Sequence, residues 1–369
     1  MRLFQNLALY DAYIPRLRRL ASPTPTFDGQ ITAMIKDRYG APHLLKPVLE
    51  RDDSAFLSNG NDEYAQRLWA REQGLPAKSS VDDILMAQVE HHRTEVFYNL
   101  NPVRFPASFV RRLPGSVKAR IGWCAAPYGK ADFSGHDLMI CNFPGILQGF
   151  ARSGLRTAYF SPSVDPMMAT YAARQDRPFD IGFVGSFTRH HARRNTLLTI
   201  VTALAAKHRV ALHLQSSSLT LLAERPLIRH LMPAKYKRPE PVRRLARGPV
   251  FGLDLYDTLA NSRIVINGAI DMAGEERGNI RCFEAMGTGA LLLSDSGRYP
   301  EGMVDGENFV TYDSPEAIAG RVTELLANPQ ELERIARRGA DMVHKRYSKP
   351  AQWNTFQELV AIVMSPSKI

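Results

Sequence analysis

The chain has 369 residues, too many for one compact core, and this length predicts two domains. Its hydrophobic content of 44% is typical of a globular protein, and no apolar run reaches the length of about 18 residues that a transmembrane helix requires. The net charge of +10 favours anionic partners, but charge alone does not choose between nucleic acid, acidic lipid and phosphorylated substrates.

The N-terminal stretch MRLFQNLALYDAYIPRL has only a short apolar patch, so it predicts a first strand and not a signal peptide. The rest of the first 80 residues is predicted to be irregular and polar, with helix-like pieces. From about Glu95 four short apolar runs follow one another: TEVFYNL, KARIGWC, HDLMIC and LRTAYF. Because helix-like or turn-like segments separate these runs, they predict βα units and an N-terminal α/β domain over residues 1–165.

Residues 161–180 contain three prolines and show no clean periodicity, which predicts an interdomain linker, placed at 166–180. A second alternation of strands and helices follows, with strands predicted from DIGFVGS, RVALHLQ, RIVING, ALLLSD and NFVTYD. It predicts a second α/β domain over 181–348, and the apolar stripe of residues 349–369 predicts a terminal helix that crosses back. In such α/β sheets ligands bind beyond the carboxyl ends of the strands, so we expect a site in a cleft between the two domains.

The stretch EERGNIRCFEAMGTGALLLSD, residues 275–295, concentrates charge where a helix is predicted to begin, near Asn279. The free N–H groups and the macrodipole at such an end favour a phosphate or another anion. At 100° per residue, Arg277, Arg281 and Glu284 share one polar stripe. A plainer interpretation is an acidic cluster that stabilises the helix, with Arg281 and Glu284 as a surface pair.

Four segments carry a resemblance to a known family: DLYDTLANSRIVIN, GNIRCFEAMGTGALLLSD, PEGMVDGENFVTYDSPEAIAGRVTELL and RIARRGADMVHKRYS. They resemble the C-terminal half of glycosyltransferases with two Rossmann-like domains, the GT-B type. The likeness is to the glycosyl transferases group 1 set, which is family 4-like and includes the CgeB-like proteins. Glu276 and Glu284 match the E-x7-E spacing of many retaining members, and DIGFVGSFTRHHARRNTLL resembles the first strand and phosphate-side loop. The resemblance covers about residues 155–347, so the acceptor, which the N-terminal half binds in this fold, is not identified.

The resemblance implies a nucleotide-diphosphate sugar donor, held mainly by the C-terminal domain, and no other cofactor. Glu276 would face the transferred sugar as the catalytic residue, and Glu284 would accept hydrogen bonds from the ribose hydroxyls. Arg281 and the helix amides at Asn279 and Ile280 would face the diphosphate. On the phosphate-side loop, donor binding is expected from these residues: Gly185, Ser186, Arg189 and Arg194.

The mechanism that the resemblance favours is retention of the anomeric configuration without a protein nucleophile. No DxD-like pair follows a strand, so we expect no metal. An inverting route would need a general base from the acceptor side, for which His136, Asp132 and Asp165 are candidates. His190 or His191, near the phosphate-side loop, is a further candidate for donor contact.

The basic stretch PAKYKRPEPVRRLARG, residues 233–248, is either a solvated face or a contact with an anionic membrane, useful for a lipid-linked acceptor. It contains one aromatic residue, Tyr236, so stacking on single-stranded nucleic acid is not expected. The three cysteines, Cys124, Cys141 and Cys282, form no CxxC pair and indicate a reducing cytoplasm.

The sequence therefore predicts a cytoplasmic glycosyltransferase, with a peripheral position at the inner membrane surface as an option. Its acceptor would be a glycan, a lipid-linked molecule or a protein. A nucleotide-sugar epimerase on the same scaffold is the alternative enzyme, and a non-catalytic protein that binds a nucleotide or another anion is the alternative from a different class.

Overall fold

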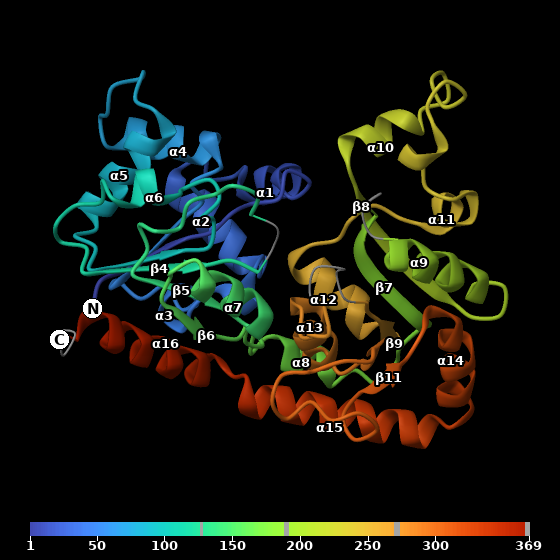
Figure 1. Ribbon diagram of the computed structural model, residues 1–369. Coiled ribbons are helices and arrows are strands. Elements are labelled where there is room, and N and C mark those ends of the chain that lie inside the picture. Colours follow the sequence, from blue (N-terminus) through green and yellow to red (C-terminus); the bar gives the residue numbers. More distant parts are fainter. Residues whose placement is uncertain (126–127, 188–191, 269–273, 366–369) are drawn as a thin grey trace. The chain divides into compact units, whose positions relative to one another are not determined.

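The computed structural model describes residues 1–125, 128–187, 192–268 and 274–365 (Figure 1). The chain divides into two compact units. Unit 1 combines Met1–Pro162 with Lys349–Ile369, and unit 2 is the continuous segment Ser163–Ser348. No helix among the described residues is long and apolar enough to cross a membrane.

Unit 1 is built on a six-stranded parallel sheet in the order β2-β1-β3-β4-β5-β6. The strands are β1 Leu3–Asn6, β2 Ala55–Ser58, β3 Val96–Asn99, β4 Ala119–Trp123, β5 Leu138–Cys141 and β6 Thr157–Tyr159. The α-helices are α1 Ile14–Ala21, α2 Phe27–Lys36, α3 Lys46–Leu49, α4 Glu63–Glu72, α5 Val81–His91, α6 Ala107–Val110, α7 Pro144–Arg152 and α16 Lys349–Met364.

Alternate side chains of the central strand β3 face the two covered sides of the sheet of unit 1. Phe97 packs in a cluster with residues of α5 and α6, whereas Tyr98 contacts Phe356 of α16, with ring centroids 4.9 Å apart. The returning helix is anchored at its start by Lys349, which is 3% exposed and whose Nζ donates to the carbonyl of Ala41 at 2.5 Å. Residues 349–364 thus form part of the core of unit 1.

Unit 2 is built on a five-stranded parallel sheet in the order β11-β10-β9-β7-β8. Its strands are β7 Phe179–Phe187, β8 Val210–Ser216, β9 Ser262–Ile266, β10 Leu291–Asp295 and β11 Val310–Tyr312. Its α-helices are α8 Met168–Ala172, α9 Ala192–Leu204, α10 Ser218–Ala223, α11 Glu240–Leu245, α12 Gly252–Ala260, α13 Ile280–Gly287, α14 Ile318–Ala327 and α15 Pro329–Arg346. Counted within each unit, both sheets place their first strand between the second and the third.

Successive residues of β9 show how the sheet of unit 2 separates two cores. Ile264 and Ile266 join a cluster with α9 and α14, whereas Val265 joins a cluster with α8, α12 and α13. Burial on both faces explains why the strands of this half are continuous apolar runs such as LLL in β10. These runs are also what made the strands of unit 2 predictable.

Two expectations about the chain's organisation are corrected. The first 80 residues are regular: they hold β1, β2 and helices whose first turns are capped by the side chains of Thr26 and Asp62. The strand AFLS has four residues, too few to show a period. The predicted linker 166–180 belongs to unit 2, where Met168 is buried and Arg177 donates to the carbonyls of Ala260 and Thr288.

Candidate functional site

The strand order of unit 2 reverses between β7 and β9, and in open α/β sheets such a reversal opens a crevice beyond the carboxyl ends of the strands. Arg194 of α9 lies at this point. One guanidinium nitrogen donates to the hydroxyl of Ser186 on β7 at 3.2 Å, and another donates to the carbonyl of Gly268, just after β9, at 3.3 Å. A positive charge is therefore held across the ends of both strands.

The strand before the predicted phosphate-side turn extends to Phe187. Gly185 and Ser186 lie within β7, where they pair with Leu214 and Gln215 of β8, because the strand continues to Phe187. Their backbone groups on that side belong to the sheet. Residues 188–191 lie between β7 and α9, outside the described residues, and they include Arg189, His190 and His191 of the prediction.

The loop before α13 turns sharply at Gly278, whose φ of +106° favours glycine over residues with a side chain. Asn279 then caps the helix: its side-chain oxygen accepts from the amide of Arg281 at 3.1 Å. The amide nitrogen of the Asn279 side chain donates to Asn267, which follows β9, at 3.3 Å. The helix start at Ile280 therefore lies beside the carboxyl end of β9, as the anion-site prediction requires, but the Arg281 amide already has a partner.

Glu276 precedes this turn and is 7% exposed. Its backbone forms a parallel bridge with Arg298, and its carboxylate lies 3.7 Å from the Arg298 guanidinium. Arg277, predicted to share the polar stripe, turns the other way. Its Nε lies 2.8 Å from a carboxylate oxygen of Asp295 at the end of β10, and both side chains are buried. Arg277 thus fixes the loop and does not add to a charged face with Arg281.

Arg281 and Glu284 form the predicted i,i+3 pair, with a donor–acceptor distance of 2.6 Å, but the pair is not on the surface. The side chains are only 15% and 6% exposed. Burial raises the pKa of the Glu284 carboxyl, and the adjacent Arg281 guanidinium opposes that rise. The plainer interpretation as a solvated surface pair is therefore wrong, because a carboxylate and a cation are held together in a nearly dry position on α13.

The candidates for a base on the acceptor side have structural partners. His136 of unit 1 is buried, with Nδ1 3.2 Å from the carbonyl of Phe133 and Nε2 3.2 Å from the side-chain amide of Asn99. Burial lowers its pKa to about 4, so the ring is neutral near pH 7. Asp165 is fully buried and belongs to unit 2, not to the N-terminal domain in which it was predicted, and it accepts from the hydroxyl of Tyr256. Asp132 is exposed and accepts from Ser134.

Sequence reasoning gave no role to Asn267, Asp295 or Arg298. Asn267 joins the helix cap to β10, because its side-chain amide donates to Ser294 at 3.1 Å. Asp295 and Arg298 hold the loop of Glu276 in place. A signal was available for Asn267 and Asp295, since each lies at the carboxyl end of a predicted strand, where sites form, and Arg298 comes three residues after Asp295.

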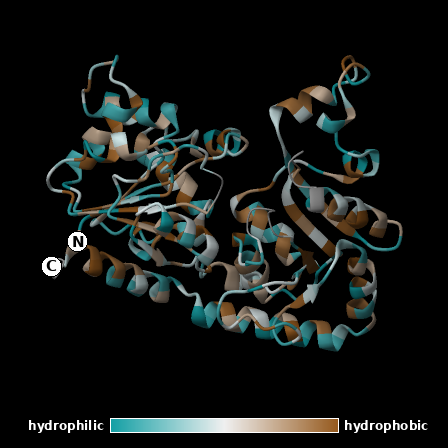
Figure 2. Cartoon of the chain, in the orientation of Figure 1, coloured by the Kyte–Doolittle hydropathy of each residue, from teal (hydrophilic) through white to brown (hydrophobic). Residues whose placement is uncertain are grey.

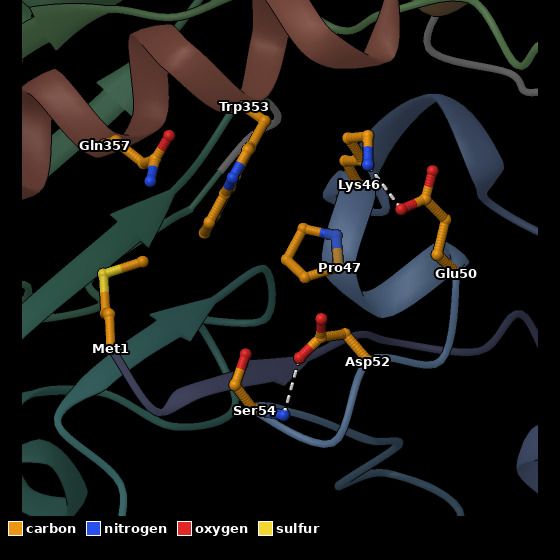
Figure 3. Close-up of a pocket in the computed structure, with 8 residues that line it drawn as sticks. All are labelled: Met1, Lys46, Pro47, Glu50, Asp52, Ser54, Trp353 and Gln357. Carbon is orange, nitrogen blue, oxygen red and sulfur yellow. Dashed lines mark hydrogen bonds and ion pairs between the residues drawn. The ribbon is translucent and has the colours of Figure 1, made fainter.

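Two cavities lie away from these residues. One in unit 1, of about 280 Å³, is lined by α3, α16 and the N-terminal residues, with Lys46 paired to Glu50 at 2.5 Å (Figure 3). The other, of about 330 Å³, lies between α10 and α11 of unit 2. Neither cavity contains a predicted site residue. Among the described residues, no three His, Cys, Asp or Glu side chains lie close enough to hold a metal ion.

Comparison with known proteins agrees with this geometry at the level of family and fold. A family model described as "Glycosyl transferase-like" matches residues 199–358, which include α13 and its loop. A search of curated proteins finds no match.

Solved structures share the whole fold at low sequence identity. HepE of Anabaena, solved with UDP-glucose, superposes with a TM-score of 0.57 at 13% identity, over 98% of this chain and 99% of that chain. A glycosyltransferase from Rickettsia africae superposes with a TM-score of 0.52 at 11% identity, over 99% of both chains. TarM superposes with a TM-score of 0.52 at 11% identity, over 76% of this chain and 58% of TarM. The narrower likeness to CgeB-like proteins stays a prediction. Residues 199–358 thus match the glycosyl transferase-like family, and the chain has the two-unit α/β fold of the GT-B glycosyltransferases.

Proposed function

We propose that this protein transfers a sugar from a nucleotide-diphosphate sugar to a glycan, a lipid-linked molecule or a protein in the cytoplasm. The observation that carries the proposal is Arg194, held across the carboxyl ends of β7 and β9 by Ser186 and Gly268. The strand order reverses there, and the family model includes Arg281 and Glu284 on the neighbouring helix. UDP-sugars come first as donors, because HepE was solved with UDP-glucose and TarM of S. aureus with UDP.

The chemistry needs stabilisation of a leaving diphosphate. Cleavage of the bond between the anomeric carbon and the phosphate oxygen leaves negative charge on the diphosphate and positive charge on the sugar. The guanidinium of Arg194 would stabilise the leaving group from a fixed position, and such preorganised charges are worth several kcal/mol of the barrier. We assign the same role to Arg281, and to Arg189, which lies outside the described residues.

The two carboxylates receive different roles in this proposal. Glu284, buried on α13, would accept from the ribose hydroxyls, and the adjacent Arg281 guanidinium opposes the rise that burial causes in its pKa. Glu276, oriented by the bridge to Arg298, would face the transferred sugar. We propose retention of configuration without a metal ion. The guanidinium groups of Arg194 and Arg281 support this proposal, since they could offset the charge of a diphosphate.

The test begins with thermal shift measurements against UDP-, GDP-, dTDP- and CMP-sugars, followed by turnover with the donor that stabilises the protein. Glu284→Ala is expected to weaken donor binding, and Glu276→Ala to lower turnover with binding retained. Glu324→Ala, at an exposed glutamate on α14, is the matched control and should change neither property.

The outcomes separate the alternatives. Conversion of the donor to its epimer without acceptor would favour an epimerase. Donor binding without turnover across an acceptor library would favour a non-catalytic binding protein. If no nucleotide sugar raises the melting temperature, or if both carboxylate variants behave like the control, the proposed site is wrong.

A further inference from the structure

Between β8 and α12 the chain of unit 2 makes a detour over residues 217–248, which we name the excursion, and it returns to the edge of β8 at Arg247, whose backbone bridges His213. It contains α10, a short 3-10 turn at Ala234–Tyr236 and α11 (Figure 1). Backbone hydrogen bonds keep the segment between α10 and this turn folded, among them those from the amide of Arg229 to Arg225 at 2.8 Å and from Leu231 to Ile228 at 3.0 Å. The excursion is therefore a folded element.

The excursion exposes large apolar side chains to solvent. Of the 14 exposed large hydrophobic residues in the described part of the chain, five fall within residues 219–231: Leu219, Leu221, Leu222, Leu227 and Leu231. Leu227 and Leu231 are 93% and 82% exposed, more than any other residue in that group. Figure 2 shows the brown of hydrophobic residues at the tip of this segment. Such clustering on a soluble surface marks an interaction site.

The charges of the excursion divide into an internal and an external set. The ion pairs are internal: Arg238 donates to both oxygens of Glu224 at 2.9 and 3.1 Å, with both side chains nearly buried, and Glu240 pairs with Arg229, Arg243 and Arg244. These pairs clamp the element. Eight arginines and lysines against two glutamates leave the excursion with a net charge of +6, out of +10 for the whole chain.

Four cations lie outside these ion pairs, and one of them, Lys237, donates to the backbone carbonyl of Arg229 at 3.0 Å. Arg225, Lys235 and Arg247 are exposed and form no ion pair with the described residues. Arg225 lies two positions after the end of α10 and two positions before Leu227. The surface therefore combines aliphatic side chains with unneutralised positive charge.

An anionic lipid bilayer is the occupant that this combination fits. Leucines at a tip can enter the boundary between headgroups and acyl chains, while arginine and lysine meet the negative headgroups. Nucleic acid fits less well, since the only aromatic residue of the excursion, Tyr236, is half-buried beside Lys235. We propose that the excursion docks this protein on an anionic membrane by inserting Leu227 and Leu231. This docking does not depend on the proposed glycosyl transfer.

The experiment is sedimentation of the full chain with vesicles, without any donor or acceptor. Vesicles of phosphatidylcholine alone are compared with vesicles that also contain phosphatidylglycerol. The wild type is expected to bind only the anionic vesicles. Leu227→Ser/Leu231→Ser should lose about a hundredfold in affinity, about tenfold for each leucine. Val304→Ser, at a 44% exposed apolar residue elsewhere in unit 2, should bind like the wild type.

The contribution of positive charge to vesicle binding is tested with a double variant and a matched control. Arg225→Gln/Lys235→Gln should weaken binding about 25-fold, about fivefold for each cation. The control Lys207→Gln/Arg209→Gln removes the same charge from another exposed part of unit 2 and should have a smaller effect. Leu227→Trp supplies a measurement independent of removing a leucine, because its emission should shift to the blue on anionic vesicles.

Three results would overturn the proposal. The first is a wild type that ignores anionic vesicles, and the second is a leucine double variant that binds them as tightly as the wild type. The third is an emission of Leu227→Trp that stays unchanged on vesicles. Self-association that the leucine double variant abolishes, without vesicle binding, would assign the surface to a second copy of the chain. Because no donor is present, a failure here leaves the proposed enzyme activity untouched.

Discussion

The substitution Arg281→Met removes the guanidinium from the buried pair on α13 and tests whether water reaches that pair. The partner Glu284 is 6% exposed and its pKa is already raised by burial. Taking away one member of a buried pair typically costs about 3–5 kcal/mol, because the remaining charge is left uncompensated. For a unit of this size, each kcal/mol lowers the melting temperature by about 2–4 °C.

The loss should depend on pH in a defined direction. A carboxyl whose folded pKa lies above its unfolded value stabilises the protein most below the unfolded pKa of about 4.5, and this stability is lost as pH rises through the folded pKa. Without Arg281 its positive charge no longer lowers the folded pKa of Glu284, so that pKa rises further. Arg281→Met should therefore be more destabilising at pH 8 than at pH 5, and adding Glu284→Gln should recover much of the loss at pH 8.

The assay can separate the two units. The three tryptophans, Trp69, Trp123 and Trp353, all lie in unit 1, so intrinsic fluorescence follows that unit while circular dichroism follows the helices of both. Urea unfolding at pH 5 and pH 8, followed by both signals, should show the larger change in the dichroism. A loss below about 1 kcal/mol at pH 8, or an equal loss at both values of pH, would show that water reaches the pair in solution and would refute the argument from burial.

Two further outcomes are expected. His136 has a pKa of about 4 in the folded protein, against 6.5 for the ordinary residue, so it contributes about 3 kcal/mol that is present above pH 6.5 and lost as pH falls toward 4. His136→Gln should reduce the acid sensitivity of unit 1 in urea unfolding, whereas His230→Gln at an exposed position should not; equal slopes would exclude His136 as the source. Gly339→Ala should destabilise unit 2 by about 1–3 kcal/mol, because a Cβ there would lie 2.4 Å from the carbonyl oxygen of Asn308. Gly320→Ala, on an open face of α14, should instead stabilise by about 0.5–1 kcal/mol, and a similar response at both positions in thermal melts would contradict the packing argument.

Prediction from the sequence succeeded where burial on both faces of a strand left a continuous apolar run. LLLSD and RIVI were recognisable as strands without any contact information, and so was the helix that starts after Asn279. The strand AFLS was missed, because four residues carry no period that separates a strand from a loop. DIGFVGS was recognised as a strand, but Gly185 and Ser186 were also assigned to donor binding at the turn expected there, and the pairing with β8 that carries β7 on to Phe187 was not visible in the local sequence.

The sequence predicted which residues lie near the start of α13 better than it predicted their side-chain contacts. Arg281 and Glu284 were paired correctly, since their spacing on a helix determines contact. Arg277 was assigned to the same face, but the chain there is a loop held by Asp295, and helical geometry does not apply to it. Whether a charged pair is solvated depends on elements distant in the sequence that cover it, so no local pattern could distinguish a surface pair from a buried one.

The return of α16 to unit 1 makes unit 2 an insertion within unit 1. Phe356 packs on the first sheet, against Tyr98 and Phe160. It is synthesised only after the nearly 190 residues of unit 2. During translation the part of the first sheet that Phe356 covers must therefore stay exposed while the inserted half emerges and folds. The nascent chain would be most vulnerable to aggregation or to chaperone capture in that interval, and assembly of the first unit would end only when its last helix leaves the ribosome.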